Sequence, residues 1–398
     1  MNKNMIEKII SSKNVDDNKV NIDMILINDS IDYKILNGIN EINISSNKME
    51  WVFSMDHFVP ASTIEFTKKH NNIKKLCEKV KGKFYYGQGI GQNIILERES
   101  VTGKLIISNE QRCTILGAVG ALAIPVVEKQ ELIDILAYGK ISLENIKVYS
   151  FELVGNYQNS SSINDVILFL IKNYKINDNN VIIEFKGEFI NNISFSDRIN
   201  LSSSASEIGA LTVIIGVDEI STNYLKQFGM SIEENSVVIS DENAQYYQNV
   251  VIDVSKITPQ IRTEIKESNC IFEKGEVGIT IDQGFVGGCS LGIDEFRNVA
   301  KLLKNKKVKS STKLLVSFPT NDMYVMALKE GIVEIFIDSG AIILNSGCGA
   351  CSGGCQGKID KNQVFVTTGK YIGNSENEGK IYFHSPNSVV KACIEGHI

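Results

Sequence analysis

Three of the eight cysteines in this 398-residue chain lie close together, in the stretch LNSGCGACSGGCQGK. Cys348 and Cys351 form a C-x-x-C pair, and Cys355 follows four residues later. Glycine, alanine and serine separate the three thiols, so the backbone can approach a bound group closely. These residue types and this spacing are compatible with a metal site, a redox pair, or a tight turn whose thiols only pack.

Each of these interpretations makes its own demands on the rest of the sequence. A structural zinc site normally takes four ligands from two such pairs, but the chain has no second C-x-x-C and only four histidines. A redox pair of the thioredoxin type would lie near the start of a small βαβ domain. An iron–sulfur cluster held by C-x-x-C and one distant cysteine leaves one iron without a protein ligand, able to polarise a substrate hydroxyl. Cys289, in the loop FVGGCSLG, is the natural third ligand, although spacing alone leaves the alternatives open.

The elements around these cysteines follow an α/β pattern. Short apolar strands alternate with amphipathic helices along the chain, which predicts a layered α/β protein. The strands GITIDQGFVGG and AIILNSGC run directly into Cys289 and Cys348. Because ligands bind at the carboxyl edge of parallel sheets, both thiols are expected at one such edge. Changes in composition predict three domains, over residues 1–147, 148–262 and 263–398.

Composition and charge narrow the class of function. The net charge is −6 and the chain has no block of Lys or Arg, so a nucleic-acid partner is not expected. The longest apolar run, CTILGAVGALAIPVV, has two glycines and a proline and falls short of the roughly 20 residues that cross a bilayer. The first residues lack the apolar core of a signal peptide, so we expect a cytoplasmic protein with no membrane segment.

With these segments in view, the chain resembles the aconitase superfamily, and most closely the large subunits of isopropylmalate dehydratase and of homoaconitase-type enzymes. Seven ordered segments, which together span nearly the whole chain, carry the resemblance. The segments are MDHFVPAST (DH-x-x-P), GQGIGQNIILE (GICHQxxxE), VIIEFKG, SDRINLSSSASEIGA (R-M-T-x-x-N-M-x-x-E-x-GA), FVGGCSLG (GSCTN), SGCGACSGG (CGPCxG) and IYFHSP (YLxSP).

The resemblance implies three α/β/α domains around a central cluster cleft. It also implies a 4Fe–4S cluster on Cys289, Cys348 and Cys351, and an enzyme that dehydrates and rehydrates a small 2-hydroxy carboxylic acid. Asp56 and His57 match the family's proton-donating pair, in which the Asp orients the imidazole. The alternative is that Asp56 and His57 only cap the following helix.

Two further groups complete the family's site. Glu184, in VIIEFKG, matches the strand that carries a catalytic glutamate. The family's base is a serine on a smaller swivelling domain, within a G-S-S-R-like loop. Since this chain contains no G-S-S-R, the resemblance implies a separate small subunit that supplies the serine.

The sequence also departs from the family pattern at several substrate-binding positions. The family's D-S-H is Glu110-Gln111-Arg112 here, and Gln92 replaces the histidine of GICHQ. Ser290 follows the first cysteine, and Lys370 holds the only positive charge in the segment that usually carries arginines. We expect Gln92, Arg112, Ser290 and Lys370 to line the substrate site. We also expect Arg112 to form a salt bridge with the buried Glu184, because an isolated carboxylate in an apolar strand is costly.

Two functions are compatible with this combination. One is an iron–sulfur hydro-lyase large subunit with altered substrate-binding residues. The other is a catalytically degenerate relative that carries a cluster as a scaffold, a sensor or a pseudo-subunit. The retained cysteines favour the first function, and the loss of D-S-H with the arginines favours the second.

Overall fold

The computed structural model describes residues 2–13, 15–16, 18–41, 49–157, 161–258, 278–351, 356–369 and 379–398. The chain divides into two compact units. Unit 1 comprises 1–54, 67–85 and 91–260, and unit 2 comprises 55–66, 86–90 and 261–398. The α/β class is confirmed, since each unit contains at least one parallel sheet with packed helices. The division into three domains stays a prediction.

Unit 1 contains most of a five-stranded sheet built on buried apolar runs such as MILIN and LIIS. The strand order is β5-β4-β3-β6-β7, and the pairs from β4 to β7 are parallel. The strands are β3 (Met24–Asn28), β4 (Glu50–Met55), β5 (Lys83–Tyr86), β6 (Leu105–Ser108) and β7 (Leu122–Pro125). The helices in this part are α2 (Tyr33–Glu41), α3 (Ile64–Val80), α4 (Gly91–Arg98), the 3₁₀ helix η1 (Gln111–Val119) and α5 (Lys129–Tyr138).

A second parallel sheet of unit 1 has the order β11-β10-β9-β12. Its strands are β9 (Lys147–Val154), β10 (Val181–Lys186), β11 (Thr212–Ile215) and β12 (Gln248–Asp253). The accompanying helices are α6 (Ile163–Asn173), α7 (Glu188–Asn192), α8 (Phe195–Ser203), α9 (Ala205–Ile208) and α10 (Glu219–Lys226). A small antiparallel sheet joins β1 (Val15–Asp16), β2 (Lys19–Asn21) and β8 (Lys140–Ser142), and α1 (Met5–Ser11) lies near the N-terminus. Two further 3₁₀ turns are η2 (Glu234–Ser236) and η3 (Val254–Lys256).

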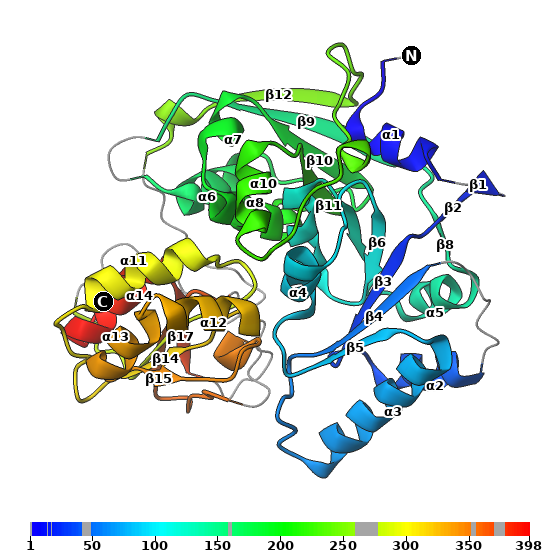
Figure 1. Cartoon of the computed structure of the whole chain (residues 1–398). Coiled ribbons are helices and arrows are strands. Elements are labelled where there is room, and N and C mark those ends of the chain that lie inside the picture. The colour runs from blue at the N-terminus through cyan, green and yellow to red at the C-terminus, as the bar shows by residue number, and fades with distance from the viewer. Residues whose placement is uncertain are drawn as a thin grey trace. The chain divides into compact units, whose positions relative to one another are not determined.

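Unit 2 is built on a five-stranded parallel sheet of order β15-β14-β13-β16-β17. Its strands are β13 (Gln283–Val286), β14 (Lys313–Val316), β15 (Ile342–Ile343), β16 (Val364–Thr367) and β17 (Lys380–Phe383). The helices are α11 (Ile293–Leu303), α12 (Asn321–Lys329), α13 (Ile332–Ser339) and α14 (Pro386–Glu395), and a 3₁₀ turn, η4, covers Gly349–Cys351. Figure 1 shows the four helices, coloured yellow to red, gathered around β14, β15 and β17.

The two faces of this sheet have different partners, because successive side chains of a strand point to opposite faces. One face packs against the four helices, through Val286, Leu314, Val316 and Val366. The other face presents Phe285, Leu315, Phe365 and Ile381, and these pack against Ala350 and Cys351. The loop that carries the C-x-x-C pair therefore lies directly on the sheet.

None of the helices in the described ranges is both long enough and apolar enough to cross a membrane.

Candidate metal centre

The candidate site lies where the parallel strands of unit 2 end. Cys289 follows β13, Ser317 follows β14, the C-x-x-C loop follows β15, and Gly369 follows β16. All four strands run parallel, so these loops meet at the carboxyl edge of one sheet. The structure thus places Cys289 and Cys348 at a common edge, as the sequence predicted.

The C-x-x-C pair forms a tight turn. The backbone N–H of Cys351 donates to the carbonyl of Cys348 at 2.9 Å, which closes η4. Cys348 is buried, and Cys351 is partly buried against the second face of the sheet. The turn therefore fixes both thiols relative to the strands.

Glycines bring the Cys289 loop beside Cys351. A Cβ atom built on Gly288 would lie 3.5 Å from the Gly369 Cα and 4.0 Å from the Cys351 Sγ. A Cβ atom on Gly369 would lie only 2.8 Å from the same sulfur, closer than real Cβ atoms approach. The backbone at Gly369 thus comes as near to the Cys351 thiol as glycine alone permits, and the backbone at Gly288 lies in ordinary contact range of the same thiol.

Asp56 and His57 complete the group of side chains at this edge. The His57 Nδ1 lies 2.6 Å from the Asp56 Oδ1, and its two ring nitrogens lie 3.9 and 4.0 Å from the Cys348 Sγ. The Cys348 N–H donates to the Asp56 carbonyl at 3.3 Å. The Asp56 side chain is 0% exposed and the His57 side chain 17% exposed. The following helix, α3, begins only at Ile64, so capping of that helix does not explain the pair.

Asp56, His57 and Cys348 could together hold a metal ion, since their ligand atoms lie within 4.8 Å of one another. Burial raises the pKa of the Cys348 thiol well above its usual range, although the neighbouring His57 acts in the opposite direction. The thiol is therefore protonated at neutral pH in the metal-free protein. A metal held by Cys348 would take the place of that proton, because metal ligation deprotonates thiols.

These residues fit an iron–sulfur cluster. The donors are thiols, which are the protein ligands that such clusters take. Gly288 and Gly369 provide the close backbone approach that a compact inorganic group needs. The Ser346 hydroxyl, two residues before Cys348, is buried with no hydrogen-bond partner in the described part of the chain. Thiol donors next to glycine backbone suit a metal–sulfur group better than an organic ligand.

The predicted Arg112–Glu184 salt bridge is wrong. Arg112 makes a two-pronged ion pair with Glu207, at 2.7 and 2.8 Å, and also contacts the Ser203 carbonyl. Arg112 lies at the start of η1, which packs on α8, and Glu207 lies in α9 directly after that helix. The helix contact therefore brings these two side chains together.

Glu184 has partners of its own within unit 1. The Ser240 hydroxyl donates to its Oε1 at 2.6 Å, and the Tyr246 hydroxyl donates to the same oxygen at 2.9 Å. The Met5 N–H, at the start of α1, lies 3.4 Å from the Oε2. This carboxylate thus joins β10 to two segments that are distant in sequence, and its burial is compensated without an arginine.

The remaining predicted residues are distributed between the units. Ser290 is buried beside Cys289 in unit 2. Gln92 is buried in α4 of unit 1, and its Oε1 has no hydrogen-bond partner in the described ranges. Lys370 and Cys355 lie outside the described residues. Sequence reasoning missed Glu207, although it belongs to the segment SDRINLSSSASEIGA, and it missed Gly369, whose role depends on its approach to Cys351.

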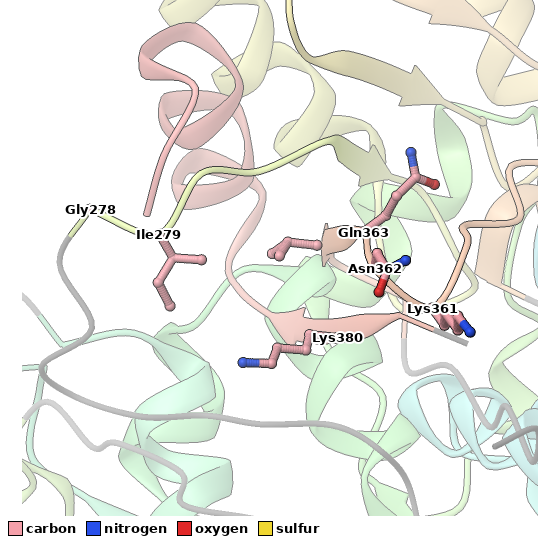
Figure 2. Close-up of a pocket in the computed structure, with 7 residues that line it drawn as sticks. Gly278, Ile279, Lys361, Asn362, Gln363 and Lys380 are labelled. Atoms are coloured by element: carbon pink, nitrogen blue, oxygen red, sulfur yellow. The ribbon is translucent and has the colours of Figure 1, made fainter. Parts of the chain in front are cut away.

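A pocket of about 610 Å³ also opens in unit 2, away from the cysteines. It lies at the amino ends of β16 and β17, and Figure 2 shows Lys361, Asn362, Gln363 and Lys380 at its rim. Among the residues that the structure describes, its lining contains no cysteine, histidine or acidic residue. The pocket is therefore separate from the metal centre, which lies at the carboxyl edge.

The α/β fold agrees with what comparison with known proteins shows. The chain belongs to the aconitase family: the family described as "Aconitase family (aconitate hydratase)" matches residues 7–271 and 262–396. The predicted resemblance is thereby confirmed.

Several similar proteins are large subunits of two named enzymes. The 3-isopropylmalate dehydratase large subunit 1 of Archaeoglobus fulgidus is 29% identical over 100% of this chain and 98% of its own length. The 3-isopropylmalate dehydratase large subunit of Clostridium kluyveri is 31% identical over 96% of this chain and 92% of its own. The methanogen homoaconitase large subunit of Methanocaldococcus jannaschii is 27% identical over 99% of this chain and 98% of its own.

Proposed function

We propose that this protein is the large subunit of an iron–sulfur hydro-lyase that acts on a 2-hydroxy carboxylic acid. The observation that carries the proposal is the meeting of the Asp56–His57 pair with Cys348 at the carboxyl edge of the unit 2 sheet. The names of its relatives, which are dehydratase and homoaconitase large subunits, support the same class of reaction.

Cys289, Cys348 and Cys351 would hold the 4Fe–4S cluster. When bound, a cluster with three protein ligands supplies a Lewis-acidic iron for a substrate hydroxyl. The chain's own contribution is a buried site, which strengthens the electrostatic interactions made inside it.

His57 is the group best placed to transfer a proton at this site. Its Nδ1 faces the buried Asp56 carboxylate at 2.6 Å, so the Nδ1–H donates to that oxygen. The hydrogen bond fixes the ring and leaves Nε2 as the position that gains or loses a proton. An imidazole oriented in this way serves as a general acid near neutral pH.

The substrate-binding residues point to an altered substrate. We propose that Gln92, Ser290 and Lys370 contribute polar contacts, and that a serine from a separate small subunit acts as the base. Both terminal nitrogens of Arg112 are engaged by Glu207, so Arg112 offers no free guanidinium fork to a carboxylate. We therefore infer a substrate with fewer carboxylates than citrate or isopropylmalate. We also propose that the enzyme is cytoplasmic.

Anaerobic reconstitution with iron and sulfide tests the proposal. The wild type should gain the visible absorbance of an iron–sulfur cluster, and its reduced form an electron paramagnetic resonance signal that shifts when 2-hydroxy acids are added. A chain that takes up no cluster would overturn the proposal. Activity should also require a small-subunit chain of roughly 160–200 residues, the size of a single domain with a G-S-S-R loop.

A second candidate is a degenerate subunit that carries the cluster without catalysis. The Arg112–Glu207 ion pair favours it, because a fixed pair cannot exchange protons easily. A cluster whose spectrum responds to no hydroxy acid, in a protein that stays inactive with the small subunit, would select this alternative.

A further inference from the structure

Two hydroxyl groups, one buried and one partly buried, brace the loops that carry the cysteines. Ser317 follows β14 and is fully buried. Its Oγ lies 2.9 Å from the Asn345 carbonyl and 2.9 Å from the Gly347 carbonyl, so one O–H is shared between two acceptors. Both acceptors belong to the loop that leads into Cys348. Ser317 therefore ties the Cys348 loop to the end of the neighbouring strand.

Thr368 makes the equivalent brace on the Cys289 loop. Its Oγ1 accepts from the Gly287 N–H at 2.9 Å and donates to the Gly287 carbonyl at 2.8 Å. Its own N–H donates to the Phe285 carbonyl at 3.0 Å, which continues the pairing of β13 with β16. A single hydroxyl thus holds both backbone groups of a residue two positions before Cys289.

Packing leaves these loops few other conformations. A Cβ atom on Gly287 would lie 2.4 Å from the Phe285 ring and 2.9 Å from the Ser317 carbonyl. A Cβ atom on Gly349 would lie 3.0 Å from the Ser317 Cβ. The strand ends, the two hydroxyls and the glycines therefore form one continuous contact beneath the thiols.

We propose that Ser317 and Thr368 are positioning residues, which hold the Cys348 and Cys289 loops in a metal-binding arrangement before any metal is bound. The inference rests on the proposed function, since it concerns the ligands of the same cluster. Fixing a loop in advance removes an entropic cost from binding. Groups that orient metal ligands affect metal affinity without touching the metal.

The test compares two brace variants with two matched controls. Thr368→Val and Ser317→Ala remove the braces. Thr312→Val and Ser339→Ala remove buried hydroxyls of unit 2 that also bond to carbonyls, those of Ile281 at 3.2 Å and Phe336 at 2.7 Å. Thr312 precedes β14, so it lies at the opposite end of the strand from Ser317.

Each protein is reconstituted anaerobically, and the rate of cluster loss to a chelator is followed by visible absorbance. The brace variants should lose the cluster about fivefold to tenfold faster than wild type, the fold-change expected for the loss of about one intramolecular hydrogen bond. The controls should lose thermal stability but keep the wild-type rate of loss. Thr368→Ser, which keeps the hydroxyl, should restore that rate.

Brace variants that keep the wild-type rate would overturn the inference while leaving the proposed function intact. Control variants that lose the cluster as fast as the brace variants would also overturn it, since any weakened unit 2 would then suffice. A wild type that takes up no cluster would overturn the proposed function itself. If a brace variant fails to fold, the rate at which Cys289 is alkylated is measured in metal-free wild type and in the metal-free Thr368→Ser variant. Because this variant keeps the hydroxyl, faster alkylation of Cys289 in it than in wild type would overturn the inference.

Discussion

The five-stranded sheet of unit 1 and the sheet of unit 2 both end in polar loops, but the loops carry different types of polar side chain. In unit 1, the loops after β3 and β6 carry groups that satisfy one another. The Asn28 Nδ2 donates to Glu110 at 3.0 Å, and the Asn109 Nδ2 donates to the Asn28 Oδ1 at 2.7 Å. Arg112 is occupied by Glu207. In unit 2, the loops carry thiols, and hydroxyls bond to the backbone instead.

The difference shows how one sheet geometry can serve two purposes. Ion pairs and amide pairs at the unit 1 edge compensate their own burial, as buried polar groups must. At the unit 2 edge the hydroxyls stabilise the loops, and the thiols lie beside the His57 ring and the backbone of Gly369. The first arrangement stabilises a fold, and the second is suited to a metal.

Removal of a ligand at the unit 2 edge should have the largest effect. In Cys348→Ser, the cluster should be lost almost completely, because a serine hydroxyl is a far poorer ligand for iron–sulfur clusters than a thiolate. Iron content and visible absorbance after anaerobic reconstitution measure this. Cys77→Ala, which removes a buried thiol of unit 1, is the control and should keep the full cluster. Equal loss in both variants would refute a specific role for Cys348.

Crowding of the same edge should have the next largest effect. Gly369→Ala places a methyl group 2.8 Å from the Cys351 Sγ and 2.9 Å from its Cβ. The thiol must move, so cluster content should fall severalfold, in line with the ~1–3 kcal/mol that overpacking costs.

Gly216→Ala is the control for this substitution, because a Cβ atom there meets nothing within 4 Å. It should leave both the cluster and the free energy of unfolding unchanged. Full cluster content in Gly369→Ala would show that the Cys351 loop yields easily and that the glycine is not required.

The sequence predicted the parts of this comparison that depend on local pattern. Apolar strands followed by cysteines placed Cys289 and Cys348 at a carboxyl edge, because strand direction in parallel sheets fixes where the following loop lies. The Asp56–His57 pair was predicted from resemblance, and its hydrogen bond is local. The partner of Arg112 was not predictable in this way. Glu207 lies 95 residues further along the chain, and only the packing of η1 on α8 brings the two together.

The roles of Ser317 and Thr368 were not predicted for the same reason, because they also depend on contacts between residues that are distant in sequence. Ser and Thr are common in loops that follow strands. The sequence alone does not distinguish a Ser or Thr whose hydroxyl bonds to a second loop. Thr368 reaches Gly287, 81 residues away, because β13 and β16 are neighbours in the sheet although two strands, three α-helices and a 3₁₀ turn lie between them along the chain. Strand order is a property of the whole domain and not of any short segment.

At the unit 1 edge, loss of one member of the ion pair should affect stability more than the cluster. In Arg112→Gln, Glu207 remains only 13% exposed and loses a two-pronged partner, so the free energy of unfolding should fall by about 2 kcal/mol. Urea unfolding measures this change. The double variant Arg112→Gln, Glu207→Gln should recover part of the loss, and the cluster spectrum should stay that of wild type. A lost cluster in the single variant would show that the two edges do not have the separate roles described above.

The smallest effect is expected for Glu184→Gln, which also tests the predicted catalytic role of this residue. The amide keeps the size of the side chain but weakens the bonds from Ser240 and Tyr246, because hydrogen bonds to a charged acceptor are stronger than those to a neutral one. The free energy of unfolding should fall by about 1 kcal/mol, and the cluster spectrum should not change. Glu188→Gln, at an exposed position of α7, should change neither. If turnover with the small subunit is abolished while stability stays at the wild-type value, Glu184 acts as a proton-transfer group; if turnover persists, its carboxylate serves only to hold α1 and the Ser240–Tyr246 segment on β10.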